Sequence, residues 1–392
     1  MWPDRRLLEL SEIEHPIVLA PMAGFGTVEL AAAVAHAGGL GSIGCATMNP
    51  HFAVETIARL QRLTSKSINI NFFCHDPAKA DADRERAWHD RLCSYCRELG
   101  IERGQRRQRV DLAPFGDAMC EVVEVTRPEV VSFHFGLPAP ALLARVKAAG
   151  CKVISSATTV EEARWLEQRG VDAVIAQGYE AGGHQGMFLD CNRNRAVALQ
   201  IGTMALVPQI ADAVSVPVIA AGGIADGRAI AAAFALGAAG VQLGTAYLLC
   251  PETVTPLLHR EALRQARGNA TVVTNVFTGR PARVLVNRLV RELGPMSDAA
   301  PDFPLPLGEL MPLRAKAEQQ GSNDFTPLWS GEAAPLAREM PAKALTLELA
   351  KEAAERFGQL NGPSRSTRSS SMSARYGSTS DFRGSNPLNK ET

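Results

Sequence analysis

The sequence predicts an α/β fold, namely a (β/α)8 TIM barrel with a smaller C-terminal lid domain and a disordered tail. Three observations support this prediction: short apolar strand segments recur, amphipathic helical stretches separate them, and glycine ends several of these helices. The strand segments are apolar throughout rather than alternating, as expected for parallel strands that are covered on both faces. Strand–helix units repeated over about 250 residues match a TIM barrel. A doubly wound open sheet is the competing architecture.

The apolar segments place the barrel strands in chain order. We expect strands at Pro16–Ala20, Leu40–Gly44, Ser67–Phe73, Val130–Phe135, Lys152–Ala157, Ala173–Gln177, Pro217–Ala221 and Gly240–Gly244. Helical stretches end at Gly38-Gly39, Gly150, Gly170 and Gly237, each just before a strand. Glycine commonly follows the last helical residue because it adopts a positive φ at little cost.

Two regions depart from this rhythm. Residues 76–129 form a long polar insertion, within which Asp81–Leu99 is expected to be one helix. After Pro251 we expect a strand at Thr271–Thr278, a helix at Ala282–Leu293 and a final helix at Ala342–Phe357. The predicted domains are a barrel over residues 1–250, completed by a helix at about 340–358, and a smaller lid domain over residues 251–324. Residues 361–392 are rich in Ser, Arg, Gly and Asn, which predicts a disordered tail.

The charge balance and the cysteine pattern argue against a nucleic-acid, membrane or metal-binding role. The chain of 392 residues carries 41 basic and 41 acidic side chains, so nothing in its net charge favours nucleic acid or an anionic membrane. The eight cysteines are scattered, which indicates buried thiols in a reducing compartment. Cys93 and Cys96 form a lone C-x-x-C pair without a second pair at zinc spacing, so no metal site is expected.

The location of the protein follows from the same kind of reasoning. The N-terminus is polar and lacks the apolar core of a secretion signal. The long apolar segment Ala229–Cys250 contains glycines and a glutamine, and we interpret it as a buried helix followed by a buried strand. We therefore expect a cytoplasmic protein without a membrane span, and homo-oligomer formation stays open.

The most informative segment is the loop that follows the sixth strand. An apolar run ends at Gln177 and opens into a loop that contains four glycines and His184. Glycines allow backbone N–H groups to approach a flat or anionic ligand. A histidine donates or accepts protons near neutral pH. This arrangement predicts a cofactor site, to which Gly182 and Gly183 contribute, with His184 as the catalytic residue beside it; a loop histidine bonded to a carbonyl is the alternative.

The last two strands of the barrel end in a matched pair of motifs. Gly222-Gly223 and Gly244-Thr245 offer bare backbone and one hydroxyl. Loops after strands seven and eight of such barrels commonly bind phosphate. Tight turns alone would also explain these glycines.

Further candidates lie at other strand ends. The amides of Asn71 and Gln177 can bind the polar edge of a flavin ring or satisfy loop backbone groups. Met22 offers a soft apolar contact to the flavin ring or belongs to the core. His134 is a candidate substrate-binding residue or a hydrogen-bonded core histidine.

At this point the motifs resemble those of the nitronate monooxygenases, also called 2-nitropropane dioxygenases, over about residues 12–357. The matching segments are Ala20-Pro-Met-Ala-Gly24, Asn69-Ile-Asn-Phe-Phe-Cys-His75, Gln177-Gly-Tyr-Glu-Ala-Gly-Gly-His-Gln-Gly186, Ala221-Gly-Gly-Ile224, Gln242-Leu-Gly-Thr245 and Pro327-Leu-Trp-Ser-Gly331. The resemblance implies a TIM barrel that carries FMN, with a smaller domain closing over the flavin. It also implies that His184 is catalytic and that FMN is contacted by Asn71, Gln177, Gly182, Gly222, Gly223, Gln242, Leu243, Gly244 and Thr245.

The activity expected from this resemblance is the FMN-dependent oxidation of alkyl nitronates, such as propionate 3-nitronate, by dioxygen to carbonyl compounds and nitrite. His184 would donate a hydrogen bond or a positive charge to the nitronate, or remove the α-proton of a neutral nitroalkane. The alternatives are an NAD(P)H-using, FMN-dependent enoyl-thioester reductase and a non-catalytic FMN-binding barrel. A barrel like that of IMP dehydrogenase would need a nucleophilic cysteine, for which Cys191 is the nearest candidate.

Overall fold

The computed structural model describes residues 2–79, 81–101, 112–190 and 197–361. Its centre is a parallel sheet of eight strands in the order β1-β9-β8-β6-β5-β4-β3-β2. The strands are β1 (Ile17–Leu19), β2 (Gly41–Gly44), β3 (Ile68–Phe73), β4 (Val130–His134), β5 (Lys152–Ala157), β6 (Ala173–Gln177), β8 (Val218–Ala221) and β9 (Gly240–Leu243). A parallel bridge between Val18 and Leu40 joins the two ends of this order and closes the sheet. Each strand lies within its expected segment, so the barrel is confirmed and the open sheet is excluded.

Helices alternate with these strands and cover the outside of the barrel. They are α2 (Val28–His36), α3 (Pro50–Leu63), α5 (Asp117–Thr126), α6 (Pro140–Ala148), α7 (Val160–Gln168), α9 (Thr203–Ala211), α10 (Gly227–Ala235) and α14 (Ala342–Asn361). Side chains of Thr27, Asn49, Thr159 and Asp226 cap the first turns of four of them by accepting backbone N–H bonds. Four of the glycines expected at helix ends adopt positive φ angles, namely Gly38, Gly150, Gly170 and Gly237, with +92° at Gly150. Helix α14 comes from the far end of the chain and packs against α10 and α2.

The barrel has an outer and an inner core. A large apolar cluster fills the space between strands and helices. A smaller cluster fills the barrel itself, and Leu7 of helix α1 (Arg6–Ser11) belongs to it. A Cβ at Gly240 would collide with Leu7, so the glycine in β9 lets α1 approach the barrel.

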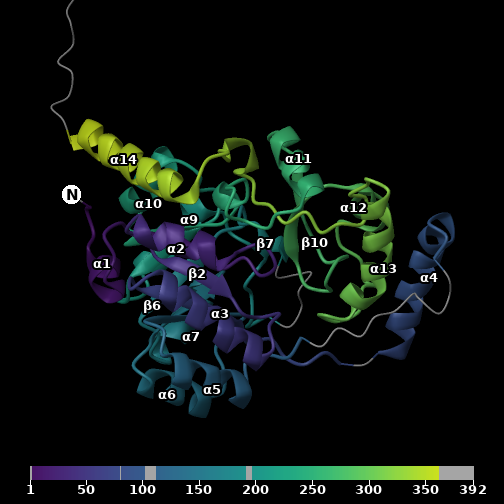
Figure 1. Ribbon diagram of the computed structural model, residues 1–392, viewed down its shortest axis with the longest axis horizontal. Coiled ribbons are helices and arrows are strands. Elements are labelled where there is room, and N and C mark those ends of the chain that lie inside the picture. Colours follow the sequence, from purple (N-terminus) through teal and green to yellow (C-terminus); the bar gives the residue numbers. More distant parts are fainter. Residues whose placement is uncertain (1, 80, 102–111, 191–196, 362–392) are drawn as a thin grey trace, which may run out of the picture.

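A second group of elements lies beside the barrel. Its sheet is antiparallel, with the order β10-β11-β7. It is formed by β10 (Thr271–Thr274), β11 (Ala282–Leu285) and β7 (Gly183–His184), the last of which belongs to the glycine loop after β6. The other elements are α4 (Ala82–Glu98), α11 (Leu257–Gln265), α12 (Arg288–Leu293), α13 (Pro306–Gln319) and the 3-10 turn η3 (Ala334–Leu336). A second 3-10 turn, η2 (Thr245–Tyr247), follows β9, and Ala246 and Tyr247 belong to the outer core of the barrel. Figure 1 shows α4, α12 and α13 on the side away from the barrel helices.

The polar stretch 76–129 serves both groups. Helix α4 packs against α13, and Trp88 and Leu92 share a buried cluster with Leu310 and Leu313. Helix α5, in contrast, is the ordinary barrel helix between β3 and β4 and packs against α3 and α6. The division of the chain into a barrel, a lid domain and a tail stays a prediction.

The structure corrects two expectations in this region. The predicted helix Ala282–Leu293 is wrong in its first part, because Ala282–Leu285 pairs as β11 with both β10 and β7. The helix begins only at Arg288, where the Asn287 side chain accepts the Val290 N–H. The expected strand Thr271–Thr278 is shorter, since pairing with β11 ends at Thr274. The final helix is confirmed and extends to Asn361.

Two of the predictions concern residues that the structure does not describe. Residue Cys191 and the tail beyond residue 361 lie outside the described residues. Within the described ranges, no helix has the length and apolar character to cross a membrane. The same ranges contain no group of three or more His, Cys, Asp or Glu side chains arranged to hold a metal ion.

Candidate active site

A cavity of about 320 Å³ lies at the carboxyl ends of the barrel strands. Its wall combines barrel residues with residues from the second group, such as Thr278, Phe303 and Trp329. The candidate residues that line it are Met22, Asn71, His134, Gln177, Gly182, Gly183, His184, Gln242, Gly244 and Thr245. Ten of the positions that the sequence predicted therefore line one cavity.

His184 lies in strand β7, where its backbone pairs with Ala282 of β11. Its Nε2 atom is 3.0 Å from the Thr278 hydroxyl. Four aromatic side chains surround the ring, with centroid distances of 6.1 Å for Phe73, 5.8 Å for Phe135, 5.4 Å for Phe303 and 5.3 Å for Trp329. We call these four side chains the aromatic cage. It surrounds the imidazole with apolar surface on several sides.

The cage keeps His184 neutral. Burial lowers the pKa of His184 to about 3, and the nearby His134, Arg280 and His75 add to this effect. Burial removes the imidazolium from water, and like charges disfavour it further. At neutral pH the side chain therefore carries one ring proton and one free lone pair.

His134 and Gln177 hold the backbone of His184. The Nε2–H of His134 donates to the His184 carbonyl at 3.1 Å, and its Nδ1 accepts the Ser156 hydroxyl at 2.6 Å. The Gln177 amide donates to the same carbonyl at 3.0 Å, and its oxygen accepts the N–H of Gly186 at 2.7 Å. Burial lowers the pKa of His134 to about 4. Both side chains thus orient the loop, which is the alternative role that the sequence had left open for each.

The side-chain amides of Asn71 and Gln242 also line the cavity, and they differ in whether their polar atoms have hydrogen-bond partners. Asn71 donates to the hydroxyl of Ser132 at 3.0 Å and to its carbonyl at 3.2 Å. The Oε1 atom of Gln242 is buried and has no hydrogen-bond partner among the described residues. A buried amide oxygen without a partner is costly, so a ligand donor at this position would stabilise the site.

The glycine positions divide into two groups. Gly182 and Gly183 line the cavity, and a Cβ at Gly182 would collide with the Gly331 nitrogen. Gly222 and Gly223 do not line it; they follow β8 with φ of +111° and +71° and lie against the glycine loop. The Leu243 side chain is only 1% exposed and belongs to the outer core of the barrel.

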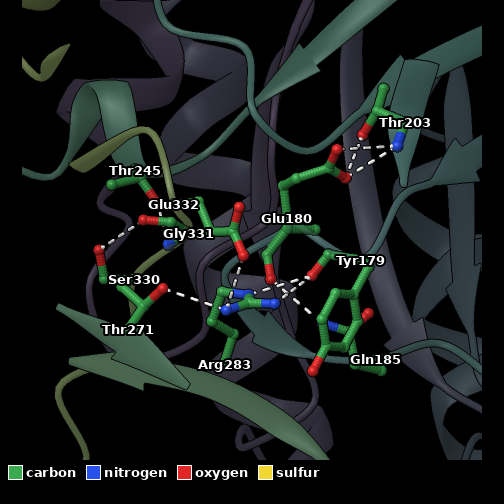
Figure 2. A network of polar contacts seen from close by, with 11 residues as sticks. Tyr179, Glu180, Gln185, Thr203, Thr245, Thr271, Arg283, Ser330, Gly331 and Glu332 are labelled. Carbon is green, nitrogen blue, oxygen red and sulfur yellow. Dashed lines mark hydrogen bonds and ion pairs between the residues drawn. The ribbon is translucent and has the colours of Figure 1, made fainter. Parts of the chain in front are cut away.

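A buried arginine connects the glycine loop to the second group of elements (Figure 2). Arg283 of β11 donates to the Tyr179 carbonyl at 3.0 and 2.9 Å and to the Thr271 hydroxyl at 3.1 Å. Its guanidinium also forms an ion pair with Glu332 at 3.1 Å. The N–H of the neighbouring Gly331 donates to the Thr245 hydroxyl at 2.9 Å. We call residues 330–332 the strap, because they lie between Arg283 and Thr245 in this network.

Sequence reasoning missed several of these residues. Thr278, Arg283, Phe303 and the strap belong to the part of the chain where no strand–helix rhythm indicated strand ends. Only the segment Pro327–Gly331 carried a signal, as a stretch that resembles the nitronate monooxygenases.

Comparison with known proteins shows the family of the chain. The family model described as "Nitronate monooxygenase" matches residues 4–352. A protein named nitronate monooxygenase from Pseudomonas aeruginosa is 43% identical over 349 residues, which cover 88% of this chain and 98% of the relative. One of the same name from Paraburkholderia phytofirmans is 42% identical over 359 residues, covering 91% of this chain and 97% of the relative.

Solved structures show the same likeness. A nitroalkane oxidase from Streptomyces ansochromogenes superposes with a TM-score of 0.82 at 39% identity, covering 90% of this chain and 99% of that one. FabK from Thermotoga maritima gives a TM-score of 0.66 at 31% identity, with coverage of 91% and 97%. The chain therefore belongs to the nitronate monooxygenase family of oxidoreductases.

Proposed function

We propose that this protein binds FMN and oxidises alkyl nitronates, such as propionate 3-nitronate, with dioxygen to carbonyl compounds and nitrite. The observation that carries the proposal is the position of His184. Its imidazole lines the same cavity as Gly182, Gln242 and Gly244. Membership of the nitronate monooxygenase family supports the same reaction.

The cavity fits a flavin in its polar and apolar surfaces. The polar edge of the flavin ring has both donors and acceptors, and the amides of Asn71 and Gln242 line the cavity. The unpartnered oxygen of Gln242 offers a buried acceptor to such an edge. Met22 supplies a polarisable apolar surface on the same wall.

The residues at the end of β9 would hold the phosphate of FMN. Gly244 and Thr245 line the cavity there, and η2 begins directly after Gly244. Bare backbone N–H groups and a hydroxyl suit an anion. Gly222 and Gly223 contribute by allowing the loop after β8 to lie close to Glu180 and Ala181.

Bound FMN supplies the redox chemistry, while the side chains position the substrate and move its proton. For a neutral nitroalkane, the lone pair of His184 accepts the α-proton. The resulting imidazolium then lies beside the anion that forms, and the aromatic cage strengthens this attraction by limiting water. A substrate that arrives as the nitronate needs no proton removal, so His184 only contacts it.

The test is nitrite release by the variant His184→Ala. We expect the variant to keep bound FMN and to lose activity by about 100-fold or more with a neutral nitroalkane, the range of general base catalysis. Nitrite and bound flavin are measured on the same preparation. The variant His51→Ala is the matched control, because His51 is on α3 with 84% of its side chain exposed.

Unchanged nitrite release by His184→Ala would remove His184 from the mechanism. Rapid anaerobic bleaching of the flavin by NADH or NADPH, without nitrite formation from nitronates, would replace the proposal with the reductase alternative.

A further inference from the structure

We infer that Thr278 is a positioning residue for this reaction: its hydroxyl holds the ring proton of His184 on Nε2, so that the Nδ1 lone pair faces the cavity. The catalytic part of this inference rests on the proposed function, whereas the position of the proton is a property of the protein alone.

The hydrogen bonds of Thr278 to Arg280 favour one direction for its contact with His184. The Thr278 hydroxyl donates to the Arg280 carbonyl at 3.2 Å. It also accepts the N–H of Arg280 at 3.3 Å. A hydroxyl has a single proton to donate, and we assign the hydrogen bond that it donates to the carbonyl of Arg280. With that proton directed to Arg280, the 3.0 Å contact to His184 is one in which Nε2–H donates to the Thr278 oxygen.

The other ring nitrogen follows from this assignment. A neutral imidazole has only one N–H, so Nδ1 of His184 carries the lone pair. Among the described residues no hydrogen bond reaches Nδ1, and the ring lines the cavity. The neighbouring His134 and His75, on and after the adjacent strands β4 and β3, and Arg280, after β10, disfavour a second ring proton. The accessible nitrogen is thus the basic one.

Thr278 is held firmly in place. Its side chain is 2% exposed, and it lies in the turn between β10 and β11. The next residue, Gly279, has φ of +83°, and a Cβ there would collide with the Pro301 carbonyl. Strand β11 pairs with His184 itself through Ala282. The same small sheet therefore fixes both the imidazole and the group that orients its proton.

Loss of the hydroxyl has a defined chemical consequence. In the variant Thr278→Val, a protonated Nε2 would be left without its acceptor in a buried place, which is unfavourable. This cost favours the other tautomer, in which the proton is on Nδ1. Nδ1 then donates a hydrogen bond into the cavity and can no longer accept a proton from the substrate. The removal of the α-proton from a neutral nitroalkane should therefore become slower. The turnover of a substrate that is already a nitronate anion should not change.

The direct test is the nitrogen NMR spectrum of the purified protein labelled with 15N-histidine. The wild type should show His184 protonated on Nε2, with its signals assigned by their absence in His184→Gln. Thr278→Ser should retain this state, and Thr278→Val should lose it. A wild-type His184 with its proton on Nδ1, or an unchanged state in Thr278→Val, would overturn the inference.

Kinetics then separate positioning from a general structural role. For Thr278→Val we expect kcat/KM to fall by about tenfold or more with nitroethane, but by less than about twofold with ethyl nitronate, because only the first needs a base. Thr278→Ser should restore the nitroethane activity. An equal loss on both substrates, or none on either, would contradict the inference. If the wild type oxidises neither compound, the proposed function fails while the NMR result still decides the position of the proton.

Discussion

Gly222 and Gly223 show at the level of single residues why the loop after β8 needs glycine where it packs against the glycine loop. A Cβ at Gly222 would lie 3.0 Å from the backbone nitrogen of Ala181, within the glycine loop. A Cβ at Gly223 would have more room, 3.6 Å from the Cβ of Glu180. Both residues adopt positive φ angles, which cost other residues about 1–2 kcal/mol. A larger side chain at Gly223 would therefore combine backbone strain with crowding next to the proposed phosphate site.

The variant Gly223→Leu should purify without flavin. Its matched control is Gly150→Leu, since Gly150 has φ of +92° and open space around its Cβ but lies at the end of α6, a helix on the outside of the barrel. Both variants carry the strain of a positive φ, so only the effect on the site differs. The ratio of flavin to protein absorbance measures the outcome. A yellow Gly223→Leu protein would argue against the phosphate assignment.

A local sequence signal was enough to find several residues that line the cavity. Strand ends and glycines indicated His184, Asn71 and Gln242, which all line the cavity. Thr278 could not be found in this way, because it lies 94 residues from His184 and follows a strand outside the barrel rhythm. Nor could the sequence decide that His134 and Gln177 bind the carbonyl of His184, since that depends on the path of the loop.

At the level of elements, β7 and β11 connect the barrel to the second sheet. Strand β7 is two residues of the glycine loop, and its pairing with β11 places Arg283 beside Gly183. Arg283 is buried and donates twice to the Tyr179 carbonyl, while Glu332 in the strap is 43% exposed. Because Glu332 can remain hydrated, its ion pair with Arg283 should stabilise the fold little. Arg283 stabilises the site mainly by donating to the Tyr179 carbonyl, which orders the glycine loop.

The variant Arg283→Met should destabilise the protein by about 1–3 kcal/mol, the cost of a buried group without its partner. Amide exchange should also rise in residues 178–186 and in the strap. Urea unfolding and exchange mass spectrometry measure the two effects. The control Arg264→Met breaks an exposed pair with Glu339, for which less than about 1 kcal/mol is expected. Equal destabilisation by both variants would show that Arg283 has no special role.

The sequence predicted the barrel strands better than the second sheet for a physical reason. Each barrel strand is a run of apolar residues enclosed on both faces, so its pattern is visible locally. Strand β11 is the short segment Ala-Arg-Val-Leu, which has no clear period, and its extended form depends on pairing with β10 and β7. Tertiary pairing thus decided between strand and helix there.

For the whole molecule, three histidines with strongly lowered pKa values couple folding to pH. Burial lowers the pKa of His134 to about 4, of His184 to about 3 and of His259 to about 4, from an ordinary value of 6.5. In the unfolded chain these groups bind protons below pH 6.5, whereas in the folded chain they remain neutral down to about pH 4. Their contribution to stability is therefore complete above pH 6.5 and is lost as the pH falls toward 4.

The free energy of unfolding should accordingly decrease between pH 6.5 and 5, by up to about 1.4 kcal/mol per pH unit for each histidine. Urea titrations at several pH values measure this slope. The variant His259→Gln removes one of the three groups and should flatten it. A free energy that stays constant or rises on acidification through this range would contradict the assignment of neutral imidazoles in the folded protein.

The central claim is that the barrel holds FMN with His184 beside the substrate, and the visible absorption spectrum tests it most directly. We predict that the purified protein, after incubation with FMN and removal of the excess, shows a bound-flavin spectrum. Anaerobic addition of an alkyl nitronate should change that spectrum, and admission of air should restore it with release of nitrite. A protein that takes up no flavin, or a bound flavin that no nitronate alters, would contradict the account.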